Sequence, residues 1–337
     1  MKLISRLTPL IILLSLLLSN CVVTPDPVEP TQSSSNSTAI SAESVSQIKL
    51  QSKLSGHSGR VFSVAFSSDG RLLASSGENK EIKLWDIATQ QEIKTFNQSD
   101  GWSIFFLAND QQLATSQCEV WDIESGEIIY SLMKNRTVCS ISPDGLVMAL
   151  VPSNKPIELW DTSTWEQIGT LDKHSDAVIG MAFSSDGSLL ATGSAMGPDD
   201  IADISVKLWS VPERRELFTL EGHSADIHAV AFSKDGSMLA SGGIDPVIKI
   251  WDVKSGQLIR SLSSGEGVMD ITFSPDGSLV ASAGCDGTVK LWNAENGSLV
   301  KTLVHGDEVM AVAFSPDGTL LASGGYDDLI YLWSISD

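Results

Sequence analysis

The chain has 337 residues, of which 42% are hydrophobic and 19% are charged, a balance typical of a globular protein. Asp and Glu number 42 against 22 Lys and Arg, so the net charge is −20. Because a nucleic-acid backbone is bound by clustered basic side chains, this acidic excess predicts no binding to nucleic acid. The cysteines have no CxxC spacing, so neither a zinc ribbon nor a thioredoxin-like pair is indicated.

The first 21 residues have the pattern of an export signal. A basic start precedes an apolar run from Leu7 to Ser19, whose 13 residues are too few to span a bilayer comfortably. The run ends in Leu-Ser-Asn-Cys, which resembles the bacterial lipobox, although Asn20 departs from the usual Gly, Ala or Ser. The resemblance implies a signal peptide over residues 1–20 and lipidation of Cys21. An uncleaved membrane helix and an ordinary cleaved signal remain alternatives.

Residues 21–47, which begin with the cysteine, are rich in Pro, Ser and Thr and show no hydrophobic periodicity. A stretch of this composition cannot bury a core, so we predict a disordered linker between the anchor and the folded domain. The expected location is the bacterial cell envelope, on the outer membrane or the extracytoplasmic face of the cell membrane. Contact with the membrane is expected through the lipid anchor alone.

Beyond residue 48 the chain is periodic. Within one unit, residues 227–243 alternate apolar and polar side chains on either side of Lys-Asp-Gly, which predicts two strands joined by a tight turn. Residues 247–262 repeat this pattern around Lys-Ser-Gly. Tryptophan recurs at positions 85, 121, 160, 209, 251, 292 and 333, with gaps of 36, 39, 49, 42, 41 and 41 residues. A period of about forty residues with four short strands per unit is typical of a β-propeller.

The repeated phrase ends in Trp-Asp in four units and in Trp-Ser or Trp-Asn in the others, and it resembles the WD-repeat family. The resemblance implies an all-β fold, a seven-bladed propeller over residues 48–337. The last unit is one strand short, and residues 47–54 resemble the missing phrase, so this N-terminal strand is predicted to close the ring and remove an open edge. The blades are predicted at residues 54–96, 97–132, 133–171, 172–220, 221–262, 263–303 and 304–337, the last completed by 47–54.

In this family a His, a Ser or Thr, an Asp and the Trp of one blade are hydrogen-bonded together. Because the set recurs in several blades, we interpret it as a buried polar network and not as a hydrolase triad. Blade 6 has no His, so its network is predicted to be incomplete, and His305 in blade 7 is displaced from the usual position. The matching residues are His57, Ser75 and Trp85; His174, Thr192, Asp203 and Trp209; His223, Ser241, Asp245 and Trp251; Ser282, Asp286 and Trp292; and Ser323, Asp327 and Trp333.

The resemblance also implies that two positions per blade face the central opening. An apolar centre with charged neighbours is the composition of a protein-contact surface, so we predict a protein or peptide partner here. Side chains that merely plug the channel are the alternative. The predicted partner-binding residues are Phe62, Trp102, Ile179, His228, Ile244, Met269, Met310 and Tyr326. The other positions hold Glu78, Thr137, Ser153, Ala202 and Cys285, with Arg60, Asp100, Asp226 and Glu308 beside them.

These features favour a non-enzymatic interaction scaffold. A glycosidase needs paired carboxylates and a metal site needs clustered ligands, whereas the ring offers Glu78, His228 and Cys285 on separate blades. We therefore predict no catalytic residue, no cofactor and no metal. The alternative is a propeller enzyme, a hydrolase or an oxidoreductase of quinones or sugars, with its site in the central channel.

Three smaller features carry expectations of their own. Residues 195–202 form an acidic insertion whose spacing does not match an EF-hand, so a solvated loop is expected. A disulfide between Cys118 and Cys139 is conceivable in an exported protein, and a small buried hydrophobe is the alternative for Cys139. His228 is expected to titrate near neutrality if it is exposed.

Overall fold

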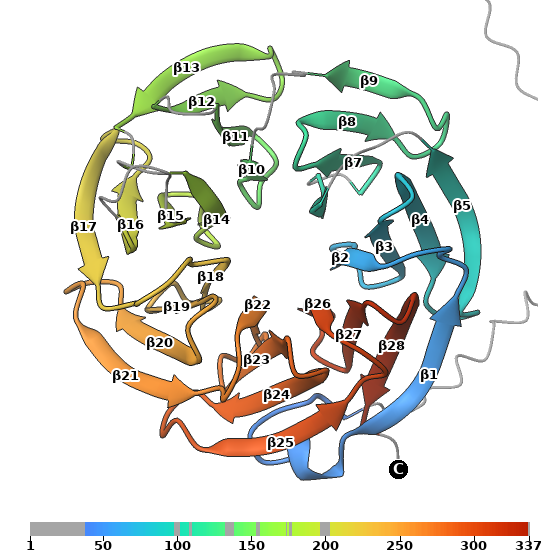
Figure 1. Ribbon diagram of the computed structural model, residues 1–337. Coiled ribbons are helices and arrows are strands. Elements are labelled where there is room, and N and C mark those ends of the chain that lie inside the picture. The colour runs from blue at the N-terminus through green and yellow to red at the C-terminus, as the bar shows by residue number, and fades with distance from the viewer. Residues whose placement is uncertain are drawn as a thin grey trace, which may run out of the picture. The chain divides into compact units, whose positions relative to one another are not determined.

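The computed structural model describes residues 38–97, 102–107, 110–131, 138–152, 156–172, 174, 177–195 and 203–335. Within these ranges the strands form seven four-stranded antiparallel sheets around a central opening (Figure 1). The predicted all-β, seven-bladed propeller is therefore confirmed. Cys21 and the rest of the chain before residue 38 lie outside the described residues, so the signal and the lipid anchor stay predictions.

Blades 1 to 4 each use four consecutive strands, counted outward from the opening. Blade 1 contains β2 (Val61–Phe66), β3 (Leu72–Gly77), β4 (Glu81–Asp86) and β5 (Gln91–Asn97). Blade 2 contains β6 (Ile104–Phe106), β7 (Gln112–Thr115), β8 (Glu119–Asp122) and β9 (Ile128–Ser131). Blade 3 contains β10 (Val138–Ile141), β11 (Val147–Val151), β12 (Ile157–Asp161) and β13 (Glu166–Leu171). Blade 4 contains β14 (Val178–Phe183), β15 (Leu189–Ser194), β16 (Ser205–Ser210) and β17 (Arg215–Glu221).

Blades 5 and 6 follow the same order, and blade 7 takes its outer strand from the beginning of the domain. Blade 5 contains β18 (Ala229–Phe232), β19 (Met238–Gly242), β20 (Val247–Asp252) and β21 (Leu258–Ser263). Blade 6 contains β22 (Val268–Phe273), β23 (Leu279–Gly284), β24 (Thr288–Asn293) and β25 (Leu299–Val304). Blade 7 contains β26 (Val309–Phe314), β27 (Leu320–Gly325), β28 (Leu329–Ser334) and β1 (Lys49–Ser55).

The ring is closed by the pairing of β1 with β28, as predicted. Figure 1 shows β1 running along the outside of β28. The Leu54 side chain of β1 is 3% exposed and belongs to the apolar cluster shared by blades 7 and 1. Closure therefore buries apolar surface and pairs an edge that would otherwise stay open.

The last part of the predicted linker is folded, which corrects the assignment of residues 38–47. Ile40 and Val45 are buried in the core cluster of blades 6 and 7, and Val45 begins a 3₁₀ turn (η1, Val45–Gln47). The Ile40 N–H donates to the Gly318 carbonyl at 2.8 Å. Two apolar side chains in a Ser-rich stretch give no periodicity, which is why composition pointed to a linker. The described residues contain no helix with the length and hydrophobicity of a membrane span.

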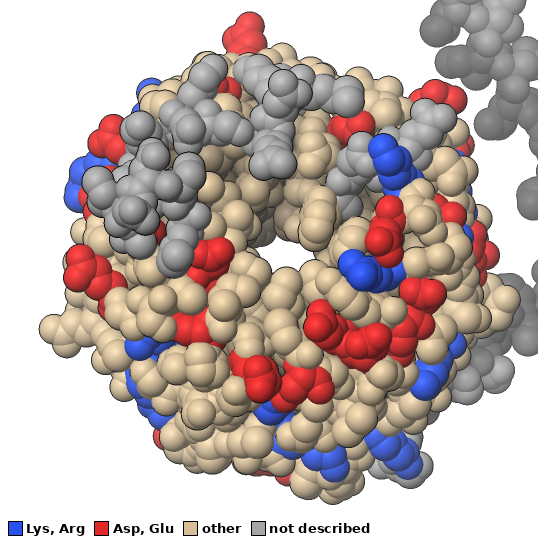
Figure 2. Space-filling view, in the orientation of Figure 1, with Lys and Arg blue, Asp and Glu red and all other residues tan. Residues whose placement is uncertain are grey.

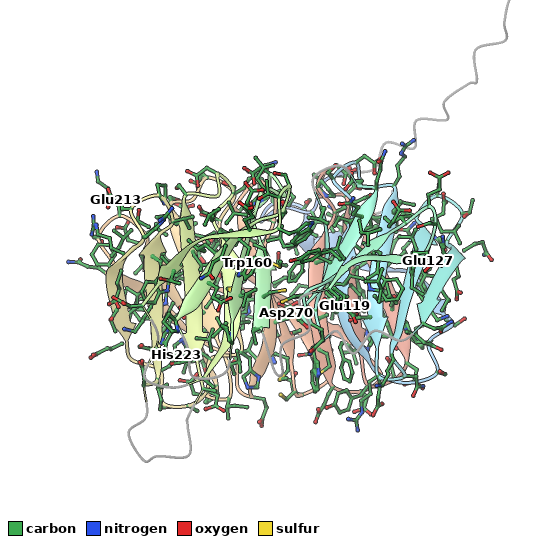
Figure 3. The ribbon with its side chains drawn as sticks, turned by 90° about the horizontal axis from the view of Figure 1, so that it is seen from above. Glu119, Glu127, Trp160, Glu213, His223 and Asp270 are labelled. Atoms are coloured by element: carbon green, nitrogen blue, oxygen red, sulfur yellow. The ribbon has the colours of Figure 1, made fainter. Side chains whose placement is uncertain are left out.

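The ring has two distinct faces because the four strands of each blade alternate in direction. The loop face carries the connections between blades and those between second and third strands. The turn face carries the tight turns, including the Asp-Gly turns. In Figure 3, which shows the ring from the side, His223 lies near the loop face and Glu213 lies near the turn face.

Candidate functional site

Six predicted partner-binding residues line one cavity of about 680 Å³ at the centre of the ring. In four blades the residue is the second of the innermost strand, where the pairing register shifts by one. Such a bulge leaves one residue unpaired and re-aims its side chain, which explains why these positions face the channel. The six residues are Phe62, Trp102, Ile179, His228, Met269 and Met310. Thr137, from the same set of positions, lies outside the described residues.

A shared backbone bond fixes the second set of positions on the loop face. In each case the residue's N–H donates to a carbonyl of the loop that enters the innermost strand. The pairs are Glu78 with Arg60 (2.9 Å), Ile244 with Asp226 (2.9 Å), Cys285 with Gly267 (3.0 Å) and Tyr326 with Glu308 (2.9 Å). A Cβ atom on Gly243 would lie 1.7 Å from the Asp226 oxygen, so this close approach requires glycine there.

Blade 4 places a different residue at this position than the sequence suggested. The Ala195 N–H donates to the Ala177 carbonyl at 2.8 Å, so Ala195 occupies the position that was assigned to Ala202. In blade 4 the inserted residues come after this position and before the loop Asp203. Because the predicted position was counted back from that Asp, the insertion displaced it from Ala195 to Ala202. Ala202 and Ser153 lie outside the described residues, and so does most of the acidic insertion.

The most exposed apolar surface of the mouth is a stacked aromatic pair. The Phe62 and Trp102 rings lie with their centroids 4.7 Å apart and their planes 14° apart. Trp102 is 60% exposed and Ile244 is 51% exposed, whereas Met310 is 9% exposed. Met310 thus behaves as a channel plug, while Trp102 and Ile244 offer apolar area to a partner.

Charged side chains border this apolar surface. The Arg60 guanidinium lies 4.0 Å from the centroid of the Tyr326 ring and 3.7 Å from the Glu78 carboxylate. Figure 2, which views the loop face, shows acidic side chains around much of the opening and few basic ones. Acidic residues of the loops that enter the innermost strands of blades 5, 6 and 7 are Asp226, Glu266, Asp307 and Glu308. The potential at the mouth is therefore expected to be negative.

His228 differs from the expectation for an exposed imidazole. Its side chain is largely enclosed in the cavity wall, and this burial lowers its pKa, while the nearby Asp226 carboxylate acts in the opposite direction. The neutral ring is thus favoured at neutral pH.

Asp270 is a cavity-lining residue that sequence reasoning missed. Its carboxylate accepts hydrogen bonds from the Ile271 N–H and, across to blade 7, from the Val312 N–H, both at 2.9 Å. Burial raises its pKa to about 7. Figure 3 shows Asp270 near the middle of the ring's height. The available signal was a charged residue on an inner strand, at the position where blade 7 has Ala311.

The predicted polar network is complete in blades 5 and 4. In blade 5, His223 Nδ1 lies 2.9 Å from Asp245 Oδ1, and its Nε2 lies 2.8 Å from Ser241 Oγ. The Trp251 indole N–H donates to the same Ser241 oxygen at 2.8 Å. In blade 4 the corresponding distances are 3.2 Å for His174–Asp203, 2.7 Å for His174–Thr192 and 2.9 Å for Trp209–Thr192.

The network is partial in blades 1 and 7. In blade 1, His57 Nε2 lies 2.7 Å from Ser75 Oγ, and Trp85 donates to that oxygen at 2.9 Å. In blade 7, Trp333 donates to Ser323 Oγ at 2.9 Å. The displaced His305 still reaches the network, because its Nδ1 lies 3.3 Å from Asp327 Oδ2.

Blade 6 retains only the pair of Trp292 and Ser282, joined at 3.0 Å. Asp286 does not join this pair, which corrects its assignment to the network. Without a histidine to bind, its carboxylate accepts hydrogen bonds from Thr288 and Lys290. The described parts of the chain contain no group of three or more His, Cys, Asp or Glu side chains that could hold a metal ion.

Comparison with known families identifies the repeat. The model of the WD domain, G-beta repeat, matches residues 48–86 and 165–210, and that of the IFT122 first beta-propeller matches residues 200–337. The chain is 29% identical over 157 residues to rat apoptotic protease-activating factor 1, a match covering 44% of the chain and 13% of that protein. It is 30% identical over 158 residues to WD repeat-containing protein SL1-17 of Schistosoma mansoni, covering 44% and 52%.

A third relative is the small ribosomal subunit protein RACK1 of Brassica napus, 36% identical over 92 residues, with 26% of the chain and 28% of that protein covered. The matches thus span about half or less of each of these relatives. The family-model matches lie between residues 48 and 337, which contain the blades described above. The seven blades, the repeated phrase and the family matches together show that the chain belongs to the WD-repeat β-propeller proteins.

Proposed function

We propose that this protein is a non-enzymatic scaffold of the bacterial cell envelope, attached by lipid at Cys21, that holds a protein or peptide partner at the mouth of the loop face. WD-repeat proteins are typically scaffolds for protein interactions. The observation that carries the proposal is the stacked Phe62–Trp102 pair, whose Trp102 ring is 60% exposed at the rim of the central cavity. Large aromatic side chains dominate the energy of buried contacts.

The charges at the mouth favour one kind of partner. Acidic side chains of three successive blades border the apolar surface, and the Arg60 cation is held against Tyr326 and Glu78. A segment that presents an apolar anchor flanked by Lys or Arg would complement this arrangement in shape and in charge. Its binding should weaken as ionic strength rises, because exposed charges are screened.

The enzyme alternative finds less support in the cavity. Asp270 is a buried carboxylate of the cavity wall, and its oxygens accept the N–H of the next residue, Ile271, and the Val312 N–H of blade 7. Because the second bond ties blade 6 to blade 7, this geometry favours a structural role.

Two exposed isoleucines make a matched test of the mouth. Ile244 lies on the loop face and is 51% exposed, while Ile93 lies on outer strand β5 and is 53% exposed. A photo-crosslinking residue at position 244 or 102 should capture a discrete partner in intact cells, and one at position 93 should not. Trp102→Ala should weaken binding of the captured partner by about 2 kcal/mol or more, with an unchanged melting temperature. A lower melting temperature with full capture would identify Trp102 as a plug instead.

The anchor is tested separately. Cys21→Ala should release the protein from the membrane fraction or stall its precursor, because no acyl chain can be attached. A Cys21→Ala protein that stays membrane-bound and normally processed would exclude the lipid anchor.

A further inference from the structure

Two buried cysteines from neighbouring blades converge on one backbone carbonyl. Cys118 lies in the turn between β7 and β8 of blade 2 and is 0% exposed, and Cys139 lies on β10 of blade 3 and is 2% exposed. The Cys139 Sγ donates to the Thr115 carbonyl at 3.1 Å, and the Cys118 N–H donates to the same oxygen at 2.8 Å. The neighbouring Cys118 side chain and burial raise the pKa of the Cys139 thiol, and both cysteines belong to one core cluster. Their side chains therefore meet across the interface between the blades.

The backbone of Cys118 is unusual for a residue with a side chain. Its φ is 58°, in the left-handed region that favours glycine. The position directly before the third strand is Gly287 in blade 6, with a φ of 76°, while Lys80 and Asp328 hold it in blades 1 and 7 with φ values of 63° and 65°. A glycine at 118 would avoid this strain, whereas a cysteine there points its thiol into the core cluster that also holds Cys139.

The contact involves blade 2, whose strands are short and which contains buried polar groups without partners among the described residues. The strands of blade 2 have three or four residues each. Among the described residues, neither the Trp121 indole N–H nor the Thr115 hydroxyl has a hydrogen-bond partner. A covalent link from this blade to the next would limit the freedom of its unfolded chain.

We propose that Cys118 and Cys139 form a disulfide between blades 2 and 3 in the exported protein, which rests on the export contained in the proposed function. Two thiols lose two protons and two electrons, and the electrons reduce the disulfide of a thiol oxidoreductase or of oxidised glutathione. One cysteine thiolate attacks the disulfide of this oxidant, which releases one thiol and leaves a mixed disulfide between the protein and the oxidant. The second cysteine thiolate then attacks the mixed disulfide and releases the oxidant's other thiol. The bond forms while blades 2 and 3 are still assembling, because burial in the finished ring keeps the oxidant away from both cysteines.

The first test counts thiols in the full-length protein recovered from the envelope. The protein is quenched with acid, denatured and labelled with a thiol-specific mass tag before or after reduction. Cys118 and Cys139 should take the tag only after reduction and should appear as one linked peptide without it. Cys285, half-buried at the mouth, should be labelled in both cases and serves as the internal control. Envelope protein with both thiols free would overturn the proposal while leaving the proposed function intact.

The second test does not depend on location. Purified protein refolded in a glutathione redox buffer should form the same bond, and its melting temperature should exceed that of the reduced protein by about 5 °C. The double variant Cys118→Gly with Cys139→Val should lose this response to reductant. Both replacements are compatible with the fold, since Gly287 and Val64 occupy the corresponding positions. Failure to form the bond on refolding would overturn the proposal wherever the protein is located. A protein that forms the bond on refolding but is never exported would instead overturn the proposed function, and with it the bond in cells, while leaving the pairing of the two cysteines intact.

Discussion

Blades 5 and 2 are built from the same repeat, yet their tryptophans have different surroundings. In blade 5 the Trp251 indole and the His223 ring share the Ser241 hydroxyl, and Asp245 holds the far side of the histidine. In blade 2, Trp121 and Thr115 stand at the positions of Trp251 and Ser241, but neither polar group is hydrogen-bonded within the described residues.

The difference shows what the network adds to a blade. Blade 2 keeps the four strands and a buried tryptophan, 5% exposed, so apolar packing is enough to set the blade's topology. The network instead satisfies polar groups that blade 5 buries, and an unsatisfied buried group is costly. The repeat thus tolerates loss of the histidine, at the expense of unsatisfied buried polar groups in blade 2.

The largest effect is expected from removing the shared hydroxyl of blade 5. Ser241→Ala leaves the Trp251 and His223 nitrogens without a partner, which should lower the free energy of unfolding by about 4 kcal/mol. Thr115→Val in blade 2 removes a hydroxyl that has no partner within the described residues, so its cost should be below about 1 kcal/mol. Urea denaturation of the two variants measures both values. Equal losses would show that the blade 5 network contributes nothing beyond packing.

A smaller effect is expected from acid, and blade 1 supplies the sharper case. Burial lowers the pKa of His57 to about 4 from its usual 6.5, and Lys83 acts in the same direction. Because the unfolded chain binds this proton more readily, stability is fully present above pH 6.5 and falls as the pH drops towards 4. The loss is about 2 kcal/mol at about pH 5.

The matched variants for this test are His57→Gln and His223→Gln. The pKa of His223 is also lowered by burial, but its hydrogen bond with Asp245 opposes the shift. His57→Gln should therefore reduce the loss of stability at acid pH more than His223→Gln does. The reverse order would show that the carboxylate in blade 5 does not offset burial.

The smallest effect concerns the first turn of each blade. Gly236 in blade 5 has a φ of 70°, and the corresponding residue of blade 2 is Asp110, with a φ of 52°. A Cβ atom on Gly236 would meet nothing within 4 Å, so Gly236→Asp tests the backbone alone. The substitution should cost about 1 kcal/mol and lower the melting temperature by about 2 °C. An unchanged melting temperature would show that the positive φ of Asp110 does not destabilise blade 2.

The periodic parts of the molecule could be predicted from the sequence, because one pattern repeats in register. Strand positions and ring closure follow from that repetition, and the resemblance to WD-repeat proteins adds the six cavity-lining residues. The bulges that aim Phe62 and Met310 inward became visible only in the structure. Departures from the repeat could not be predicted. Asp286 binds Lys290 because no histidine competes for it, and Ala195 precedes an insertion that shifts the alignment. The first departure follows from a histidine that blade 6 lacks, and the second follows from residues that blade 4 adds, so neither belongs to the shared pattern.

The pairing of β1 with β28 gives the protein a dependence on the order of its synthesis. Strand β1, which completes the ring, precedes the other strands of the propeller in the chain, and its partner β28 (Leu329–Ser334) follows them all. Until β28 has been made, Leu54 has no core to enter and blade 7 keeps an open edge. Joining segments so far apart in the sequence is entropically costly and slow. A chain that lacks β28 therefore cannot close the ring, and its unpaired strand edge is open to pairing with other chains.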